Sequence, residues 1–438
     1  MAKVQTLAYV DIQHDAPAVF DDVEQGVVLR EDFWVSGYKS GTTSVHGKVR
    51  VEAADGGGVD IEPRDGVRIE RLSKVSSFME SAELTTQSNF VISVPSLGIN
   101  SLSVRFPRQV INPPYTKKTN VSPELHISSI DYSDKSEQLV IGGTDGYCVV
   151  VSPSDTKNVV ELKGHVGDVQ HVQWFPSGEV VLTASSDLSV RVFSSKTGAN
   201  PRTLKGHTRA VTATAILGVG RQVLSASKDG TVRLWTVGEA KEAKKWRVDA
   251  GRAVDGLVVV GDEAGLQALD VIAEDEQVIL AATPDGSISA FTLSSSSLTV
   301  PIFVSPPPVP SNLIAIAYSP STGLIATGHA NGITAIRHLS ALRPVEEGHE
   351  APLPTLIKRN EAPIYSLAFV DRDGRLDLLV GTGSGLPSRL ALDIDANGTI
   401  TASTKEEYAG WEAVSVESWA VGADSVFCAG GEGGVRRY

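Results

Sequence analysis

Two consecutive segments of the chain share one internal spacing, and this repeat limits the possible folds more than any other feature. The first, GHVGDVQHVQWFPSGEVVLTASSDLSVRVF, begins at Gly164, and the second, GHTRAVTATAILGVGRQVLSASKDGTVRLW, begins at Gly206, 42 residues later. In both copies a histidine precedes an aspartate by 22 residues, and an aromatic residue follows that aspartate after six. Chance rarely produces three coincident spacings. The sequence therefore predicts a fold made of stacked repeats.

Each copy predicts four short β-strands. The runs VQHVQW, VVLTAS and SVRVF have strand-like patterns, and the turn signals PSG and SSD separate them. No helical period occurs between these runs. Four strands in about 42 residues, with a histidine near the start and an aromatic residue near the end, resemble one blade of a WD-repeat β-propeller.

The same spacing continues on both sides of the two clear copies. Asp145 lies 42 residues before Asp187, and Asp285 is followed after six residues by a phenylalanine. Asn331 and Glu432 occupy the same turn position farther along the chain. The sequence thus predicts an all-β fold, a seven-bladed WD-repeat β-propeller preceded by a small β-rich N-terminal domain. The expected blades are 124–163, 164–205, 206–250, 251–305, 306–359, 360–408 and 409–438.

The last expected blade has only three strands before the sequence ends at Tyr438. A missing fourth strand would leave an unpaired sheet edge, which favours aggregation. We therefore expect a ring-closing strand from Ser101–Asn120, for instance within SLSVRFPRQV. The expected domains are 1–100, the β-rich N-terminal domain; 101–123, a linker with the ring-closing strand; and 124–438, the propeller.

The repeat residues predict a buried hydrogen-bonded tetrad in each clear blade. In such a chain the tryptophan donates to a hydroxyl, the hydroxyl donates to the histidine, and the histidine donates to the aspartate. The expected members are His207, Ser225, Asp229 and Trp235 in blade three, and His165, Thr183 and Asp187 in blade two, where Phe193 replaces the tryptophan. A catalytic triad uses the same residue types. Because the set recurs at the repeat spacing, we interpret it as structural.

The remaining motifs do not indicate catalysis. GTGSG at Gly381–Gly385 resembles a phosphate-binding loop, but no helix is expected after it to hold an anion, so we expect a turn. The sequence contains no G-x-S-x-G, H-E-x-x-H or paired C-x-x-C motif. Cys148 and Cys428 lie in apolar, strand-like runs and are expected to be buried thiols. We expect no enzymatic activity, no cofactor and no bound metal.

The charge balance limits the partners. The chain has 52 acidic and 39 basic residues, a net charge of -13. This excess of acids disfavours nucleic acids and anionic membranes as ligands and favours a basic protein surface. The N-terminal residues show no secretory signal, and no apolar window approaches the length of a membrane span. We expect a soluble protein of the cytoplasm or the nucleus.

Several motifs together resemble one family of WD-repeat proteins. GHVGDV at 164–169, FPSG at 175–178, GRQVLSASKDGTVRLW at 220–235 and the final GGVRRY are similar to the proteasomal ATPase-associated factor family. The similarity is dense over blades two and three, patchy over blades four to six, and dense again at the C-terminus. It implies a chaperone that assists assembly of the base of the 26S proteasome regulatory particle.

The resemblance also implies a partner and a contact. The propeller would bind the C-terminal domain of a proteasomal ATPase subunit, would meet other base-assembly chaperones only indirectly, and would be a monomer outside that complex. Propeller geometry places the loops between blades and the turns between second and third strands on one rim. The candidate protein-binding residues on this rim are Asp168, Asp255, Glu361, Trp411, Glu412 and Glu432. Each acid is alternatively a solvated rim charge, and Trp411 is alternatively a core residue.

Blade four is longer than its neighbours, because 56 residues separate Asp229 from Asp285 where the repeat spacing is 42. The surplus falls near the acidic segment 261–276, GDEAGLQALDVIAEDE, which is either a solvated loop or a partner contact. Two other functions fit parts of the sequence. A generic WD-repeat adaptor, such as a ubiquitin-ligase substrate receptor or a signalling scaffold, would share the fold. A propeller hydrolase would need a polar, titratable cluster at the central channel.

Overall fold

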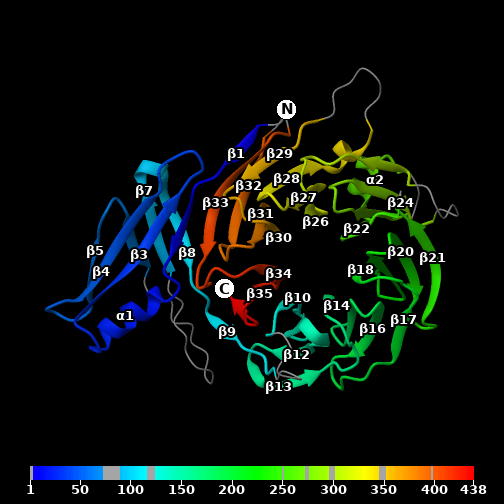
Figure 1. The fold of residues 1–438 in the computed structure, drawn as a ribbon, viewed down its shortest axis with the longest axis horizontal. Helices are drawn as coiled ribbons and strands as arrows, with labels where there is room; N and C mark the ends of the chain where they lie inside the picture. Colours follow the sequence, from blue (N-terminus) through cyan, green and yellow to red (C-terminus); the bar gives the residue numbers. More distant parts are fainter. Residues whose placement is uncertain are drawn as a thin grey trace.

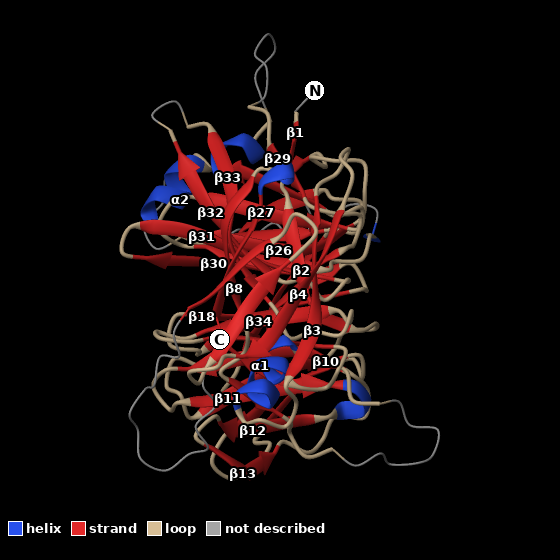
Figure 2. Ribbon diagram, turned by 90° about the vertical axis from the view of Figure 1, so that its left-hand side faces the viewer, coloured by secondary structure: helices blue, strands red, loops and turns tan. Residues whose placement is uncertain are grey.

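The chain forms a ring of β-sheets with a second, smaller β-rich body on the outside of the ring (Figure 1). The computed structural model describes residues 3–72, 89–115, 124–248, 251–271, 276–294, 301–344, 352–395 and 398–438. Figure 2 shows the helices in blue against a body made almost entirely of strands. The predicted all-β class and the propeller architecture are confirmed.

The ring is built from antiparallel sheets whose strands follow one another in chain order, so each sheet corresponds to one blade. The ring strands are β10 (Ile127–Ser133), β11 (Gln138–Gly143), β12 (Cys148–Ser152) and β13 (Asp155–Glu161); β14 (Val169–Trp174), β15 (Val180–Ser185), β16 (Ser189–Ser194) and β17 (Arg202–Lys205); β18 (Val211–Leu217), β19 (Gln222–Ser227), β20 (Thr231–Thr236) and β21 (Lys241–Arg247); β22 (Gly256–Val260), β23 (Val278–Ala282), β24 (Ile288–Thr292) and β25 (Phe303–Ser305); β26 (Leu313–Ser319), β27 (Leu324–His329), β28 (Ile333–His338) and β29 (Thr355–Lys358); β30 (Ile364–Arg372), β31 (Arg375–Thr382), β32 (Ser388–Ile394) and β33 (Ile400–Tyr408); and β34 (Val416–Val421), β35 (Val426–Gly430) and β36 (Val435–Arg437).

The core of the ring lies between neighbouring sheets. Val140 of one sheet packs with Val172 of the next, and Leu182 packs in the same way with Trp235. Burying one such side chain contributes about 1.5–3 kcal/mol. The innermost strands β10, β14, β18, β22, β26, β30 and β34 contact one another in this order, and β34 contacts β10. The sheets therefore surround a central opening as a closed ring (Figure 1).

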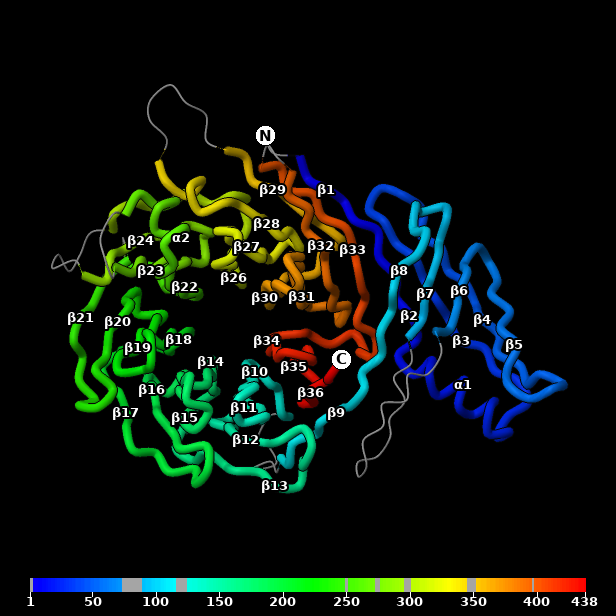
Figure 3. Tube along the Cα trace, turned by 180° about the vertical axis from the view of Figure 1, so that it is seen from behind, coloured from blue at the N-terminus to red at the C-terminus, as the bar shows by residue number. Residues whose placement is uncertain are grey.

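A strand from before the ring completes the last blade. β9 (Gln109–Ile111) pairs antiparallel with β36 and is the outermost strand of that sheet. It comes from the segment in which the sequence predicted a ring-closing strand, and Figure 3 shows the cyan chain running from β8 to β9 beside β36. The first part of the predicted run SLSVRFPRQV pairs elsewhere, because it belongs to β8 (Ile99–Arg105). Residues 116–123 of the expected linker lie outside the described residues.

The N-terminal body is a sandwich of two sheets covered by one helix. Its first sheet contains β2 (Tyr9–Ile12), β3 (Arg30–Tyr38), β4 (Val45–Ala53) and β5 (Val59–Pro63). Its second layer, β6 (Arg68–Leu72), β7 (Asn89–Val94) and β8, continues the sheet of blade six, which therefore has seven strands. The sequence prediction named only strands here, but helix α1 (Ala16–Glu24) is also present. Pro17 stands in its first turn, and Val19, Phe20 and Val23 are buried against the sheets.

Three strands connect the N-terminal body to three consecutive blades. β1 (Val4–Thr6) pairs parallel with β29 of blade five, and β8 pairs parallel with β33 of blade six. β9 then pairs with β36 of blade seven. Parallel pairing between segments about 300–400 residues apart has no local sequence signal. The N-terminal body is therefore joined to the ring through backbone hydrogen bonds.

The surplus of blade four includes helix α2 (Glu263–Ala268), which lies between β22 and β23. Asp262 caps this helix by accepting a hydrogen bond from the N–H of Gly265 at 2.7 Å. Residues 272–275 of the acidic segment lie outside the described residues. Short 3-10 helices occur at η1 (Pro95–Leu97), η2 (Thr144–Gly146) and η4 (Leu339–Leu342).

Candidate protein-binding site

In blade three the four repeat residues form a continuous hydrogen-bonded chain. Trp235 Nε1 donates to Ser225 Oγ at 2.8 Å, and Ser225 Oγ lies 2.7 Å from His207 Nε2. His207 Nδ1 lies 2.9 Å from Asp229 Oδ2. Because the indole uses a lone pair of the hydroxyl, the hydroxyl proton points to Nε2, and Nδ1–H donates to the carboxylate. Asp229 also accepts from the N–H of Thr208 at 3.0 Å, so the chain fixes the entry loop of the blade to its second turn.

Blade two contains the same chain without the indole. His165 Nε2 lies 2.7 Å from Thr183 Oγ1, and His165 Nδ1 lies 2.9 Å from Asp187 Oδ2. Phe193 fills the position of the tryptophan and is fully buried. Burial lowers the pKa of His165 and outweighs the opposing effect of Asp187, so the ring is neutral near pH 7. The hydroxyls of Thr183 and Ser225 are buried inside their blades and cannot contact a substrate.

Contacts across the loops show that the second turns and the inter-blade loops share one rim of the ring. The N–H of Asp145, in the second turn of blade one, donates to Asp168 Oδ1 in the loop before blade two at 2.9 Å. Arg252, in the loop before blade four, forms an ion pair with Asp285 in the second turn of that blade. This rim carries the candidate acids.

Asp168 and Glu361 are the candidates that present a carboxylate to solvent most directly. Asp168 is exposed, and one of its oxygens accepts the N–H of Asp145. The side chain of Glu361 is 82% exposed and lies 2.7 Å from Lys358 Nζ. An exposed pair of this kind is worth about 0.2–1 kcal/mol, so a partner can displace it.

Asp255 is half-buried at the same rim, in the loop before blade four. Burial raises the pKa of this carboxyl above its usual range, and the nearby charge of Lys228 opposes the effect. Oδ1 of Asp255 has no hydrogen-bond partner in the described part of the chain. This oxygen is buried, so Asp255 presents less of its carboxylate to a partner than an exposed rim acid does.

Trp411 is not an exposed contact residue, and this part of the sequence prediction is wrong. Only 7% of Trp411 is exposed, and its Nε1 donates to the hydroxyl of Tyr438 at 3.0 Å. The guanidinium of Arg436 lies over the indole, 4.0 Å from the ring centroid. The indole packs into the core of blade seven because its neighbours, including Trp419 and Tyr408, supply an apolar pocket.

Glu412 and Glu432 lie together at this end of the rim. The N–H of Glu412 donates to Glu432 Oε1 at 3.0 Å, and the other carboxylate oxygen of Glu432 pairs with Arg436. Glu412 Oε1 lies 3.0 Å from Nε2 of His14 in the N-terminal body. Glu432 thus supports the loop, whereas Glu412 faces the N-terminal body.

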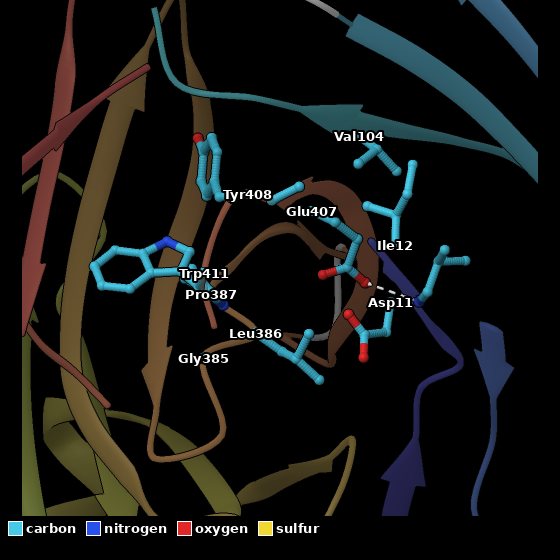
Figure 4. Close-up of a pocket in the computed structure, with 12 residues that line it drawn as sticks. Asp11, Ile12, Val104, Gly385, Leu386, Pro387, Glu407, Tyr408 and Trp411 are labelled. Carbon is cyan, nitrogen blue, oxygen red and sulfur yellow. Dashed lines mark hydrogen bonds between the residues drawn. The ribbon is translucent and has the colours of Figure 1, made fainter. Parts of the chain in front are cut away.

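The structure also contains a crevice that the sequence did not predict. It has a cavity volume of about 320 Å³ and lies between the N-terminal body and blades six and seven. Its lining includes Asp11, His14, Trp34, Leu386, Trp411 and Glu412. A smaller pocket shares Asp11 and Leu386 with this crevice, and there the carboxylates of Asp11, from β2, and Glu407, from β33, point into the same space (Figure 4).

Sequence reasoning missed this crevice because its two walls are about 370–400 residues apart in the chain. One local signal was available at Trp34. In EDFWVSGY the neighbours Phe33 and Val35 point into the core, so alternation places Trp34 on the outer face of the strand. Trp34 is 40% exposed and lines the crevice.

Among the described residues, no group of three or more histidine, cysteine or acidic side chains has a geometry that could hold a metal ion. No helix in the described part of the chain has the length and apolar character needed to cross a membrane. Both cysteines are buried and unpaired, in agreement with the sequence prediction.

Comparison with known proteins gives two matches. The family model for the WD domain, G-beta repeat, matches residues 156–194 and 198–236, which include both complete hydrogen-bonded chains from their histidines to their aromatic positions. The chain is also 41% identical over 66 residues to the 26S proteasome regulatory subunit RPN14 of Saccharomyces cerevisiae. This similarity covers 15% of the chain and 16% of the yeast protein, so it spans a small part of each. The chain is therefore a β-propeller that carries WD repeats and is similar in part to a subunit of the proteasome regulatory particle.

Proposed function

We propose that the chain is a non-catalytic chaperone that binds the C-terminal domain of an ATPase subunit of the 26S proteasome base and assists assembly of that base. The partial similarity to a 26S proteasome regulatory subunit is the observation that carries this proposal. The WD-repeat propeller supports it, because such rings present rigid rims on which another protein can dock. Cytoplasm and nucleus, where proteasome assembly takes place, are the compartments that the proposal implies.

The rim supplies the chemistry of the contact. The net charge of -13 and the exposed acids Asp168 and Glu361 favour a basic face on the ATPase domain. Complementary charges accelerate encounter and fix the orientation of the partners. Asp255 is a lesser candidate, because its unpaired oxygen Oδ1 is buried beneath the rim surface.

The test is to measure binding of the full chain to each isolated ATPase C-terminal domain by native mass spectrometry and calorimetry. The decisive variant is the double substitution Asp168→Asn and Glu361→Gln. Asparagine keeps the oxygen that accepts the N–H of Asp145, so the loop is preserved while the charge is removed. Exposed charges contribute about 0.2–1 kcal/mol each, and the variant should weaken Kd roughly twofold to thirtyfold, mainly through the association rate.

The matched control is Glu179→Gln. The side chain of Glu179 is 60% exposed and pairs with Lys196, as Glu361 pairs with Lys358. Asp168 precedes β14 and Glu179 follows it, so the control lies at the opposite end of the blade. Equal affinities for the double variant and this control would remove the acidic rim from the contact. A stable complex with a ubiquitin ligase, without binding to any ATPase domain, would contradict the proposed function and favour an adaptor.

A further inference from the structure

A buried ion pair of the ring positions the strand β2, which lines the crevice between the N-terminal body and the ring. Both oxygens of Glu407, in β33, accept hydrogen bonds from Nη2 of Arg359, at 2.5 and 2.6 Å. The same guanidinium lies over the ring of Tyr9 in β2, 5.2 Å from its centroid. Glu407 Oε1 also lies 3.4 Å from the N–H of Val10. These contacts fix β2 against blade six and so determine where Asp11 points.

The small pocket that shares Asp11 with the crevice contains more negative than positive charge. Asp11 and Glu407 face the same space, and Arg359 is already engaged with both oxygens of Glu407 (Figure 4). Burial raises the pKa of Asp11 to about 6, and the backbone N–H of Ile12 offsets this effect only in part. Because few groups offset the cost of burying its charge, ionised Asp11 destabilises the folded chain. Carboxylates that bind ligands often show this property when no ligand is bound.

The mouth of the crevice presents an aromatic wall. The side chain of Trp34 is 40% exposed, and the backbone N–H of the same residue donates to Oε1 of Gln13 at 3.2 Å, which ties β3 to the segment after β2. Glu412 and His14 also line the crevice, where they pair at 3.0 Å, and both side chains are partly exposed. The lining thus combines an indole with carboxylates.

We propose that this crevice binds an arginine side chain from an extended segment of a partner protein, with Asp11 as its counter-ion and Trp34 as the face on which the guanidinium stacks. A guanidinium is planar, weakly hydrated and permanently charged, and it pairs with carboxylates while stacking on aromatic rings. A volume of about 320 Å³ accommodates one such side chain with its flanking backbone. The site goes beyond the proposed function, because Asp11 and Trp34 belong to the N-terminal body and not to the acidic residues of the rim, and it does not require an ATPase domain as partner.

The test uses the full chain and a pentapeptide with a central arginine and blocked ends. The probe is compared with the same peptide containing citrulline, the neutral analogue of arginine. Binding is followed on the indole N–H signals of the six tryptophans, and the signal of Trp34 is identified by its loss in Trp34→Phe. The arginine peptide is expected to shift the Trp34 signal saturably, and the citrulline peptide should bind at least about tenfold more weakly, since a charged hydrogen bond is lost.

Asp11→Asn should weaken binding of the arginine peptide by a similar factor, because it removes the counter-ion while keeping the shape of the side chain. This variant is expected to melt no lower than the unmodified chain, since it removes a charge that burial already disfavours. Asp60→Asn is the matched control, because it removes an exposed carboxylate from β5 of the same body. Equal binding of the two peptides, no saturable shift of Trp34, or equal affinities of Asp11→Asn and Asp60→Asn would each overturn the proposal. None of these results bears on the ATPase-domain test above.

Discussion

At the scale of single residues, the turn aspartate of blade three shows how a buried charge stabilises a blade. Burial alone would raise the pKa of Asp229, but the hydrogen bonds from His207, Thr231 and the N–H of Thr208 outweigh burial and hold the pKa well below its usual range. A carboxyl whose pKa is lower in the folded than in the unfolded chain adds stability above its ordinary pKa. That contribution is lost as the pH falls toward the folded value.

We therefore predict that Asp229→Ala lowers the free energy of unfolding by about 1–3 kcal/mol at pH 7, because it leaves His207 Nδ1–H and the N–H of Thr208 without an acceptor. Urea unfolding measures this loss. The difference in the free energy of unfolding between the variant and the unmodified chain should persist from pH 7 to pH 5. It should narrow at lower pH, where Asp229 of the unmodified chain takes up a proton, first in the unfolded state.

Asp285→Ala is the control for this prediction. Asp285 holds the same turn position in blade four and accepts the N–H of Ser287 at 3.1 Å, but its side chain is 44% exposed and no histidine bonds to it. Asp285→Ala should therefore lower the free energy of unfolding clearly less than Asp229→Ala does. Equal costs would show that the turn, rather than the buried chain, is what the aspartate stabilises.

At the scale of elements, the three-residue strand β9 closes the ring with one buried side chain. Ile111 is 1% exposed and packs in the core shared by the first and last blades, whereas its neighbour Val110 is 47% exposed. Ile111→Ala should reduce the free energy of unfolding by about 2–5 kcal/mol, because it leaves a cavity where the ring joins. Chemical denaturation of the full chain measures the effect.

Val110→Ala serves as the comparison within the same strand. It removes an apolar side chain that already contacts water, so its effect should remain within about 0.5 kcal/mol. If both substitutions cost the same, β9 does not contribute to the core of the closed ring.

The elements that could be predicted from the sequence are those whose partners are close along the chain. The spacing from His165 to Asp187 marks a blade because its strands pair with their immediate neighbours, which the turn signals separate. β1 and β8 gave no such signal. Each pairs with a strand hundreds of residues away, and Gln5 even forms side-chain hydrogen bonds with the backbone of Ala402. Helix α1 was missed because nine residues contain little of a helical period.

The candidate site shows the same limit. The acids of the rim could be predicted because turn positions in a propeller always face one end of the blades. Trp411 could not be placed, since its burial depends on Arg436 and Tyr438 folding back over it from the last strand. The crevice was invisible for a related reason: Asp11 and Glu407 meet only when the N-terminal body docks on blade six.

At the scale of the whole molecule, the N-terminal body packs against a buried ion pair of the ring that links blades five and six, because Tyr9 lies under Arg359 and the N–H of Val10 donates to Glu407. The side chains of Arg359 and Glu407 are only 6% and 4% exposed. Burial raises the pKa of Glu407 to about 7, with the charge of Arg359 opposing the change. Glu407 therefore depends on Arg359 to remain ionised at neutral pH, and β2 depends on both for its position.

Arg359→Met should consequently destabilise the chain in a pH-dependent manner. Removing one partner of a buried pair costs about 3–5 kcal/mol when the other stays charged, and less when it takes up a proton. Loss of the guanidinium raises the pKa of Glu407 further, so the variant folds with a neutral Glu407. In the unfolded chain Glu407 has its ordinary pKa and loses its proton at a lower pH than in the folded variant, so a rising pH favours unfolding. The loss in melting temperature should therefore be greater at pH 8.5 than at pH 6.

The double variant Arg359→Met with Glu407→Gln separates charge from packing. It contains no buried ionisable group at this position, so it should recover most of the lost stability at pH 8.5 and lose the excess pH dependence. The remaining difference from the unmodified chain measures the packing of Arg359 on Tyr9 and its hydrogen bond to the carbonyl of Leu386 at 3.2 Å. A single variant as stable as the double variant at both pH values would mean that Glu407 does not need the charge of Arg359, and that the paired strands β1, β8 and β9 hold the N-terminal body without help from this ion pair.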